Sequence, residues 1–206
     1  MRQLTTSLID GAPRPIGRGA PPARQTGLTM VELLTVMVIV AILMAVGIPS
    51  FRYVTTDNRM STEANELLGD LQYARSEAVR EGQTVTVCVA QSTSPTSPSC
   101  AAAGTTNWEK GWIVFGDANG NQAIDSGTDS VLRIQNAFAG GDTFAADNNI
   151  NAISFSRSGF VNRLGAPKAT VTLKDSTSNS AYTRCLYLQQ SGMLSVQTHS
   201  QTSSCS

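Results

Sequence analysis

The sequence predicts an α+β fold in which one long N-terminal helix packs on an antiparallel β-sheet. An apolar run over residues 28–48 is followed by a stretch with helical periodicity that reaches residue 82. Beyond residue 82, apolar residues alternate with polar ones in short segments, as in half-buried strands. No helical pattern separates these segments, which favours antiparallel pairing over a parallel α/β sheet.

The apolar run LTMVELLTVMVIVAILMAVGI extends from Leu28 to Ile48, and its only charged residue is Glu32. As a helix it would be about 31 Å long, close to the thickness of a bilayer core. A cleaved secretory signal is one alternative, but its apolar region is usually about 7–15 residues and ends in a small-residue cleavage site. A buried core helix is the other alternative. We expect a membrane-spanning helix over residues 28–49.

The charges before and after this run differ. Residues 1–27 contain four arginines and one acid, whereas the rest of the chain has 11 basic and 14 acidic residues. Basic residues beside a span stay on the cytoplasmic side. The head is therefore expected in the cytoplasm and the remainder in the periplasm, with the span in the inner membrane.

Glu32 is unusual because a carboxylate inside a span costs about 2.5–3.5 kcal/mol on insertion scales. One reading places it near the interface, where it favours the positive end of the helix dipole. A functional reading needs a cation at the same depth, and a newly made amino terminus would supply it.

The segment Gly27-Leu-Thr-Met-Val-Glu32 resembles the processing site of type IV prepilins, in which glycine precedes the cut and glutamate is the fifth mature residue. The resemblance implies that a prepilin peptidase cleaves after Gly27 and methylates the amine of Leu28. Leu28 stands where phenylalanine is usual, a mild departure. The resemblance also implies that Glu32 neutralises the amino terminus of a neighbouring subunit during assembly. Pro49 falls at mature position 22, where the family carries a proline that invites a kink.

Later segments are similar to the GspH/FimT group of minor pilins and pseudopilins. They are DLQYARSEAVRE from residue 70, VTVC from 85, GWIVF from 111 with Asp117 and Asn119, VLR from 131, and ISF from 153 with Gly159. The resemblance implies a pilin-like structural subunit of a type II secretion pseudopilus or a type IV pilus. Its partners would be the prepilin peptidase, other pilins through the N-terminal helix, and the inner-membrane assembly platform. The implied parts are a cleaved leader (1–27), a transmembrane helix (28–49), its amphipathic continuation (50–82) and a GspH/FimT-like β domain (83–206).

The helical continuation has apolar residues spaced by three and four, and Gly82 is a suitable stop. These residues are Met60, Ala64, Leu67, Leu68, Leu71, Ala74, Ala78 and Val79. We expect this stripe to pack on the sheet. Strands are expected at 85–89, 112–115, 131–134, 153–156, 170–173, 184–188 and 194–197. Residues 91–107 are expected to form a flexible loop without a core of its own.

The four cysteines form two spaced pairs, and an even number in an exported domain favours disulfides. Three pairings are possible, of which the sequential one joins Cys88 to Cys100 and Cys185 to Cys205. A metal site is the rival, but there is no CxxC spacing and the one histidine is His199.

A second candidate metal site begins like a calcium-binding loop, with oxygen donors at Asp117, Asn119, Asn121 and Asp125. Gln122 replaces the glycine of the sixth place and Thr128 the glutamate of the twelfth. A hairpin turn rich in Asn, Gly and Asp is the favoured interpretation.

The sequence contains no GxSxG elbow or glycine-rich phosphate loop, and His199 lies in a polar tail. We therefore expect a structural protein without a cofactor, not an enzyme. The alternative is a DNA-binding minor pilin for DNA uptake, since some FimT-like relatives use arginines in the tail after their last glycine. Here no Lys or Arg follows Gly192. Four basic residues within 18 positions could still form a patch on DNA, or be scattered surface charge: Arg157, Arg163, Lys168 and Lys174.

Overall fold

The computed structural model describes residues 27–164, 166–198 and 205. The predictions for residues 1–26 and for His199 lie outside these residues. The chain divides into two compact units, Met1–Val46 and Gly47–Ser206, which are described separately. The helices are α1 (Met30–Glu81) and the short 3-10 helices η1 (Trp108–Lys110) and η2 (Ser180–Tyr182). The strands are β1 (Val85–Ser92), β2 (Ser99–Cys100), β3 (Gly111–Gly116), β4 (Ser130–Asn136), β5 (Thr143–Ala146), β6 (Ala152–Phe155), β7 (Val161–Asn162), β8 (Lys168–Lys174), β9 (Arg184–Gln189) and β10 (Leu194–Thr198).

Helix α1 has a defined start and stop. The backbone N–H of Glu32 donates to Thr29 Oγ1 at 3.2 Å, so Thr29 caps the first turn. Thr29 and Glu32 have the spacing of a capping box. At the other end Gly82 has φ +70°, and its N–H donates to the Ala78 carbonyl at 3.1 Å. Glycine adopts this left-handed conformation without a Cβ penalty, so the helix ends where the sequence predicts.

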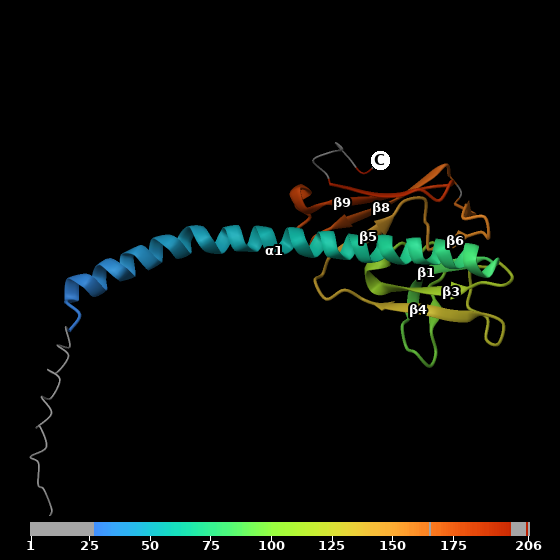
Figure 1. Ribbon diagram of the computed structural model, residues 1–206, viewed down its shortest axis with the longest axis horizontal. Helices are drawn as coiled ribbons and strands as arrows, with labels where there is room; N and C mark the ends of the chain where they lie inside the picture. Colours follow the sequence, from blue (N-terminus) through green and yellow to red (C-terminus); the bar gives the residue numbers. More distant parts are fainter. Residues whose placement is uncertain (1–26, 165, 199–204, 206) are drawn as a thin grey trace, which may run out of the picture. The chain divides into compact units, whose positions relative to one another are not determined.

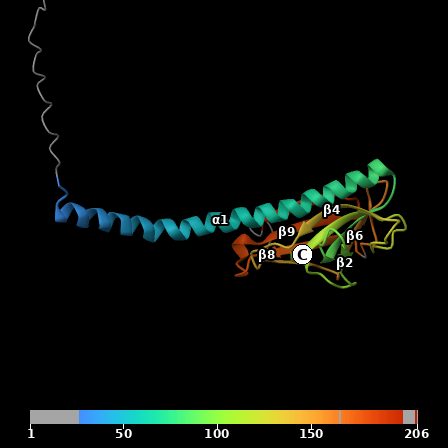
Figure 2. The same ribbon diagram turned by 90° about the horizontal axis from the view of Figure 1, so that it is seen from below.

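The part of α1 in the second unit buries one stripe of side chains. Met60, Ala64, Leu67, Leu71, Ala74 and Ala78 are all fully buried. Figure 2 shows this part of α1 along one face of the strands. The prediction is wrong for Val79, whose side chain is 55% exposed. Successive helical residues differ by about 100° around the axis, so the neighbour of a central stripe residue such as Ala78 points to the side.

The strands divide into two antiparallel sheets rather than one. The first has the order β4-β3-β1-β6-β7, with β2 paired to β1, and the second has the order β10-β9-β8-β5. In Figure 1, β8 and β9 lie above the second-unit part of α1, while β3 and β4 lie below it. The sheets separate because β6 returns beside β1 whereas β5 pairs with β8.

All seven predicted strands are present, and β2, β5 and β7 are additional. These three have two to four residues each. They are too short to show an alternating pattern, and β5 (Thr-Phe-Ala-Ala) contains mostly small side chains. The fold class is confirmed, but the strand count and the division into two sheets depend on pairings that the sequence pattern does not encode.

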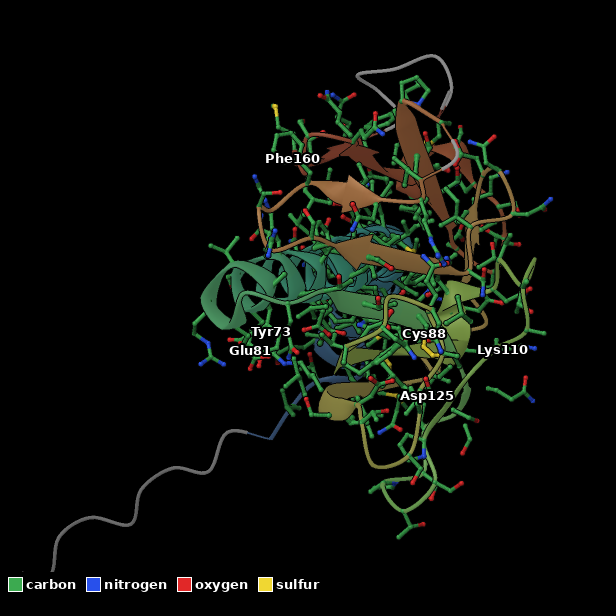
Figure 3. The ribbon with its side chains drawn as sticks, turned by 90° about the vertical axis from the view of Figure 1, so that its right-hand side faces the viewer. Tyr73, Glu81, Cys88, Lys110, Asp125 and Phe160 are labelled. Atoms are coloured by element: carbon green, nitrogen blue, oxygen red, sulfur yellow. A yellow bond between two sulfur atoms is a disulfide. The ribbon has the colours of Figure 1, made fainter. Side chains whose placement is uncertain are left out.

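The two faces of the first sheet bury different clusters. The inward residues Val85, Val87 and Val89 of β1 join the main core with α1 and the second sheet. The outward residue Cys88 belongs to a smaller cluster that includes Ile113 and Phe115 of β3. Figure 3 shows Cys88 on the side of the first sheet away from Tyr73 of α1. Strand β1 is therefore covered on both faces.

The expectation of a coreless loop over residues 91–107 is wrong. Strand β1 continues to Ser92, and β2 pairs with it after a turn. Ala101 is buried in the main core, and its N–H donates to the Val89 carbonyl at 2.8 Å. The end of this segment therefore contributes to the core despite its Ser/Thr-rich composition.

Candidate functional site

The predicted processing site lies at the start of α1. Gly27 has open space around it, and the Leu28 side chain is 74% exposed. Glu32 occupies the first turn of α1, where the capped N–H groups and the helix dipole favour a negative charge. The structure thus places Gly27, Leu28 and Glu32 within one short segment at the amino end of an apolar helix.

The apolar half of α1 is a candidate membrane anchor by length and composition. Its most apolar 18-residue window has a mean hydropathy of 2.7 and is not buried within the protein. The large apolar side chains from Leu28 to Ile48 are exposed, including Leu34, Ile39 and Leu43. A soluble protein rarely exposes so large an apolar surface without a lipid or protein partner. Pro49 lies within α1, after this run.

Both cysteine pairs are bonded, which confirms the prediction of disulfides. Cys88 of β1 is joined to Cys100 of β2, so this bond closes the hairpin formed by residues 88–100. Cys185 of β9 is joined to Cys205 near the C-terminal end. Each bond restricts the unfolded chain and ties a segment back to a sheet.

The loop after β3, the weak calcium candidate, is held by its own side chains. Asp117 is fully buried and accepts hydrogen bonds from Thr86 Oγ1 at 2.8 Å and from the N–H groups of Asn121 and Gln122 at 3.0 Å. The Asp125 carboxylate accepts from the side-chain amides of Asn119 and Asn121 at 2.8 and 2.7 Å.

These contacts indicate a turn closed by Asx-type hydrogen bonds. Among the residues that the structure describes, no group of three His, Cys, Asp or Glu side chains is arranged to hold a metal ion. Figure 3 shows Asp125 on the same side of the first sheet as Cys88, so this loop helps to cover that face.

The four basic residues of the DNA alternative are distributed over both sheets. Arg157 lies in the turn between β6 and β7, and Arg163 directly after β7. Lys168 and Lys174 lie at opposite ends of β8, which at about 3.3 Å per residue separates their backbones by roughly 20 Å. The four basic residues therefore do not lie together on one helix or strand.

Several polar contacts that sequence reasoning missed fasten α1 to the sheets, among them an ion pair between Arg184 of β9 and Asp57 of α1. Three others lie further along the helix. In the first, Arg59 contacts Asp142, which precedes β5, with Nε and Nη2 each 2.9 Å from a carboxylate oxygen. Glu63 lies one turn along the helix, is 5% exposed, and its Oε2 is buried without a hydrogen-bond partner among the described residues. Burial and the nearby Asp142 charge raise the pKa of Glu63 to about 7, although Arg59 opposes the change.

The second contact centres on Asp70. Its carboxylate accepts a hydrogen bond from the buried indole N–H of Trp112 at 2.8 Å and from Arg133 at 2.5 Å. The Arg133 guanidinium also lies 4.1 Å from the centre of the Tyr73 ring. Asp70 therefore satisfies an indole N–H in the core and links α1 to both β3 and β4.

The third contact joins α1 to both sheets. The Arg75 guanidinium donates to the carbonyls of Gly159 and Gly192 at 3.0 Å each. Gly159 lies in the turn between β6 and β7, and Gly192 in the turn between β9 and β10. Both glycines have positive φ, and a Cβ on Gly192 would overlap the Gly159 carbonyl oxygen. Arg75 thus bridges two turns that only glycine allows to approach so closely.

The chain matches two protein-family models. The model "Type II transport protein GspH" matches residues 63–192, and "Prokaryotic N-terminal methylation motif" matches residues 22–48. A search of curated proteins gave no match.

The fold is similar to crystal structures of the type IV minor pilin FimU from Pseudomonas aeruginosa. One has a TM-score of 0.55 at 22% identity and covers 72% of this chain and 96% of FimU. A second crystal form has a TM-score of 0.51 at 22% identity, with 71% and 99% covered. The minor pseudopilin EpsH from the type 2 secretion system of Vibrio cholerae has a TM-score of 0.45 at 14% identity, with 67% and 95% covered.

The GspH model covers more than half of the chain, and the methylation motif coincides with Gly27, Leu28 and Glu32. The FimU structures support the same overall fold over about 70% of this chain. The chain therefore belongs to the GspH family of type II transport proteins and is a minor pilin or pseudopilin of the type IV filament systems.

Proposed function

We propose that this protein is made with a leader, processed after Gly27, and inserted in the bacterial inner membrane by residues 28–49. A prepilin peptidase cleaves the leader (residues 1–27) and methylates the Leu28 amine. Residues 50–82 continue the helix, and the β domain (83–206) lies in the periplasm or in the filament. The protein has a structural role in a type II secretion pseudopilus or a type IV pilus, with no catalytic role.

The observation that carries this proposal is the coincidence of the methylation motif with an exposed apolar run, residues 28–48, whose only charged residue is Glu32. Glu32 is costly in hydrocarbon unless it is paired. Cleavage after Gly27 creates an amino group only four residues away in sequence. In a bundle of such helices, the amine of one subunit and Glu32 of the next would neutralise each other and fix the register of the subunits.

The test replaces Glu32 with alanine in the full chain. Removing a charge from the span favours insertion, so Glu32→Ala is expected to reach the membrane and be processed at wild-type levels. Its incorporation into filaments is expected to be lost, because the neighbouring amine has no counter-charge. The matched control is Glu66→Ala, an exposed carboxylate on the second-unit part of α1. Wild-type incorporation of Glu32→Ala would refute the assembly role.

A further inference from the structure

The segment of α1 that directly follows the apolar run is exposed and carries aromatic side chains. Phe51 is 71% exposed, Tyr53 52% and Val54 50%, and Arg52 between them is also exposed. Phe51 is only three residues beyond Ile48, the last residue of the run. At about 1.5 Å per residue this is roughly 5 Å along a helix, less than the depth of a headgroup layer.

The loop between β8 and β9 lies beside the same turns of α1. The rings of Tyr53 and Tyr182 are 5.3 Å apart, and Arg184 Nη2 is 2.5 Å from Asp57 Oδ1. Residues 176–181 of this loop (Ser-Thr-Ser-Asn-Ser-Ala) are exposed and uncharged. We call the combined surface of residues 51–54 and 174–182 the collar.

The acidic groups in and beside the collar already have partners within the protein. Asp57 pairs with Arg184. Asp175 accepts hydrogen bonds from the Thr177 hydroxyl, the Thr177 N–H at 3.1 Å and the Asn179 N–H at 2.8 Å. Burial tends to raise the pKa of Asp175, but these hydrogen bonds outweigh it and lower the pKa, so the carboxylate is charged and internally bound.

The basic groups of the collar differ from these acidic groups. Arg52 and Lys174 are both exposed, and neither has an ion-pair partner among the residues that the structure describes. The collar therefore presents two free cations beside two exposed aromatic rings and a polar loop. Aromatic rings concentrate at the level of lipid headgroups, and an anionic membrane surface attracts each nearby Lys or Arg.

We infer that the collar is a lipid contact: Phe51, Tyr53 and Val54 lie in the headgroup layer of the bilayer, and Arg52 and Lys174 bind anionic lipid phosphates. This inference rests on the proposed membrane span. A lipid surface fits better than a protein partner because residues 176–180 of the collar are polar and uncharged, without the buried apolar centre of a specific protein interface. The contact would hold the β domain at the membrane before assembly.

The test measures the depth of position 51 in lipid nanodiscs. Full-length Phe51→Trp is reconstituted with lipids brominated near the headgroup or deep in the acyl chain. The native Trp108 and Trp112 are fully buried, so wild-type protein supplies the background. We expect strong quenching of Phe51→Trp by the shallow bromines only. Val79→Trp is the matched control, because it is also exposed on α1 but about 42 Å further along, and it should not be quenched.

A third variant, Ile39→Trp, separates failure of the inference from failure of the anchor. Quenching of Ile39→Trp by deep bromines, without quenching of Phe51→Trp, would overturn the collar and leave the anchor standing. Absence of quenching at both positions would refute the membrane span as well. An unquenched Phe51→Trp that becomes shielded from iodide only in assembled filaments would assign the surface to a neighbouring subunit and overturn the lipid contact.

A double variant tests whether Arg52 and Lys174 bind anionic lipid phosphates. In Phe51→Trp nanodiscs, brominated phosphatidylglycerol should quench more than brominated phosphatidylcholine at the same mole fraction. The double variant Arg52→Gln with Lys174→Gln should remove this preference for phosphatidylglycerol. Each cation is expected to contribute about five-fold to the affinity for the anionic lipid. The control is Arg157→Gln with Lys168→Gln, two exposed basic residues outside the collar. An unchanged preference in the collar variant would contradict the phosphate contacts.

Discussion

Replacing Glu63 with glutamine tests whether the buried carboxylate pair makes folding depend on pH. Glu63 is 5% exposed and faces Asp142, while Arg59 and Glu66 are the other charged groups that act on it. Its ordinary pKa of 4.5 rises to about 7 in the folded protein. Below pH 4.5 the group is protonated in both states. Between pH 4.5 and 7 the folded state keeps a proton that the unfolded chain has lost, so stability falls as pH rises through this window.

The size of this effect follows from the pKa difference. At about 1.4 kcal/mol per pKa unit, a change from 4.5 to about 7 is worth at most about 3.5 kcal/mol. That is a substantial part of the net stability of about 5–15 kcal/mol of a typical protein. Glutamine keeps the size of the side chain and can donate to Asp142, but it does not titrate. Glu63→Gln is therefore expected to be about 1–3 kcal/mol more stable than wild type at pH 8 and equal to it below pH 4.5.

The assay is equilibrium denaturation of the oxidised full chain at several pH values, monitored by the fluorescence of Trp108 and Trp112, which are both buried in the second unit. Glu66→Gln makes the same chemical change at an exposed position on α1. Because Glu66 contributes the smallest part of the shift of the Glu63 pKa, this variant should retain most of the wild-type pH dependence. A Glu63→Gln protein whose stability falls with pH as steeply as that of wild type would refute the assignment of this pH dependence to Glu63.

Three further predictions concern the contacts that hold the domain together, each measured by the same denaturation assay. Gly192→Ala should lower the free energy of unfolding by more than about 2 kcal/mol, because the φ of Gly192 is +79° and a Cβ would overlap the Gly159 carbonyl oxygen. A change below about 0.5 kcal/mol would contradict the close approach of the two turns. Arg75→Met should lose about 2–3 kcal/mol with its carbonyl hydrogen bonds, and Arg75→Lys should recover only part of this loss. Replacing both Cys88 and Cys100 with serine should cost about 3 kcal/mol, whereas wild-type stability would mean that the hairpin needs no covalent closure.

The sequence predicts those parts of the fold that have a local pattern. The buried stripe from Met60 to Ala78, the stop at Gly82 and the alternation in β1 follow from periodicity and from one glycine, and the structure confirms them. The prediction is wrong for Val79 because the spacing of three and four residues does not separate the centre of the buried stripe from its edge. Strand β5 was missed because its residues Thr143–Ala146 are few and mostly small.

The polar contacts were not predictable for a different reason. The partners of Arg75 lie 84 and 117 residues further along the chain, and Asp70 meets Arg133 across 63 residues. Such pairings depend on the arrangement of the two sheets, which no local pattern determines. One local polar contact could have been predicted. Thr29 and Glu32 have the spacing of a capping box, which predicts that α1 starts next to the predicted cleavage site.

The most direct test of the proposed function is the N-terminal sequence and intact mass of the membrane-extracted protein, from cells with and without a prepilin peptidase. We predict a chain that begins with N-methylated Leu28 when the peptidase is present and an uncleaved chain when it is absent. An intact Met1 in both strains, or cleavage beyond Pro49, would contradict processing at Gly27 and the membrane anchor that follows it.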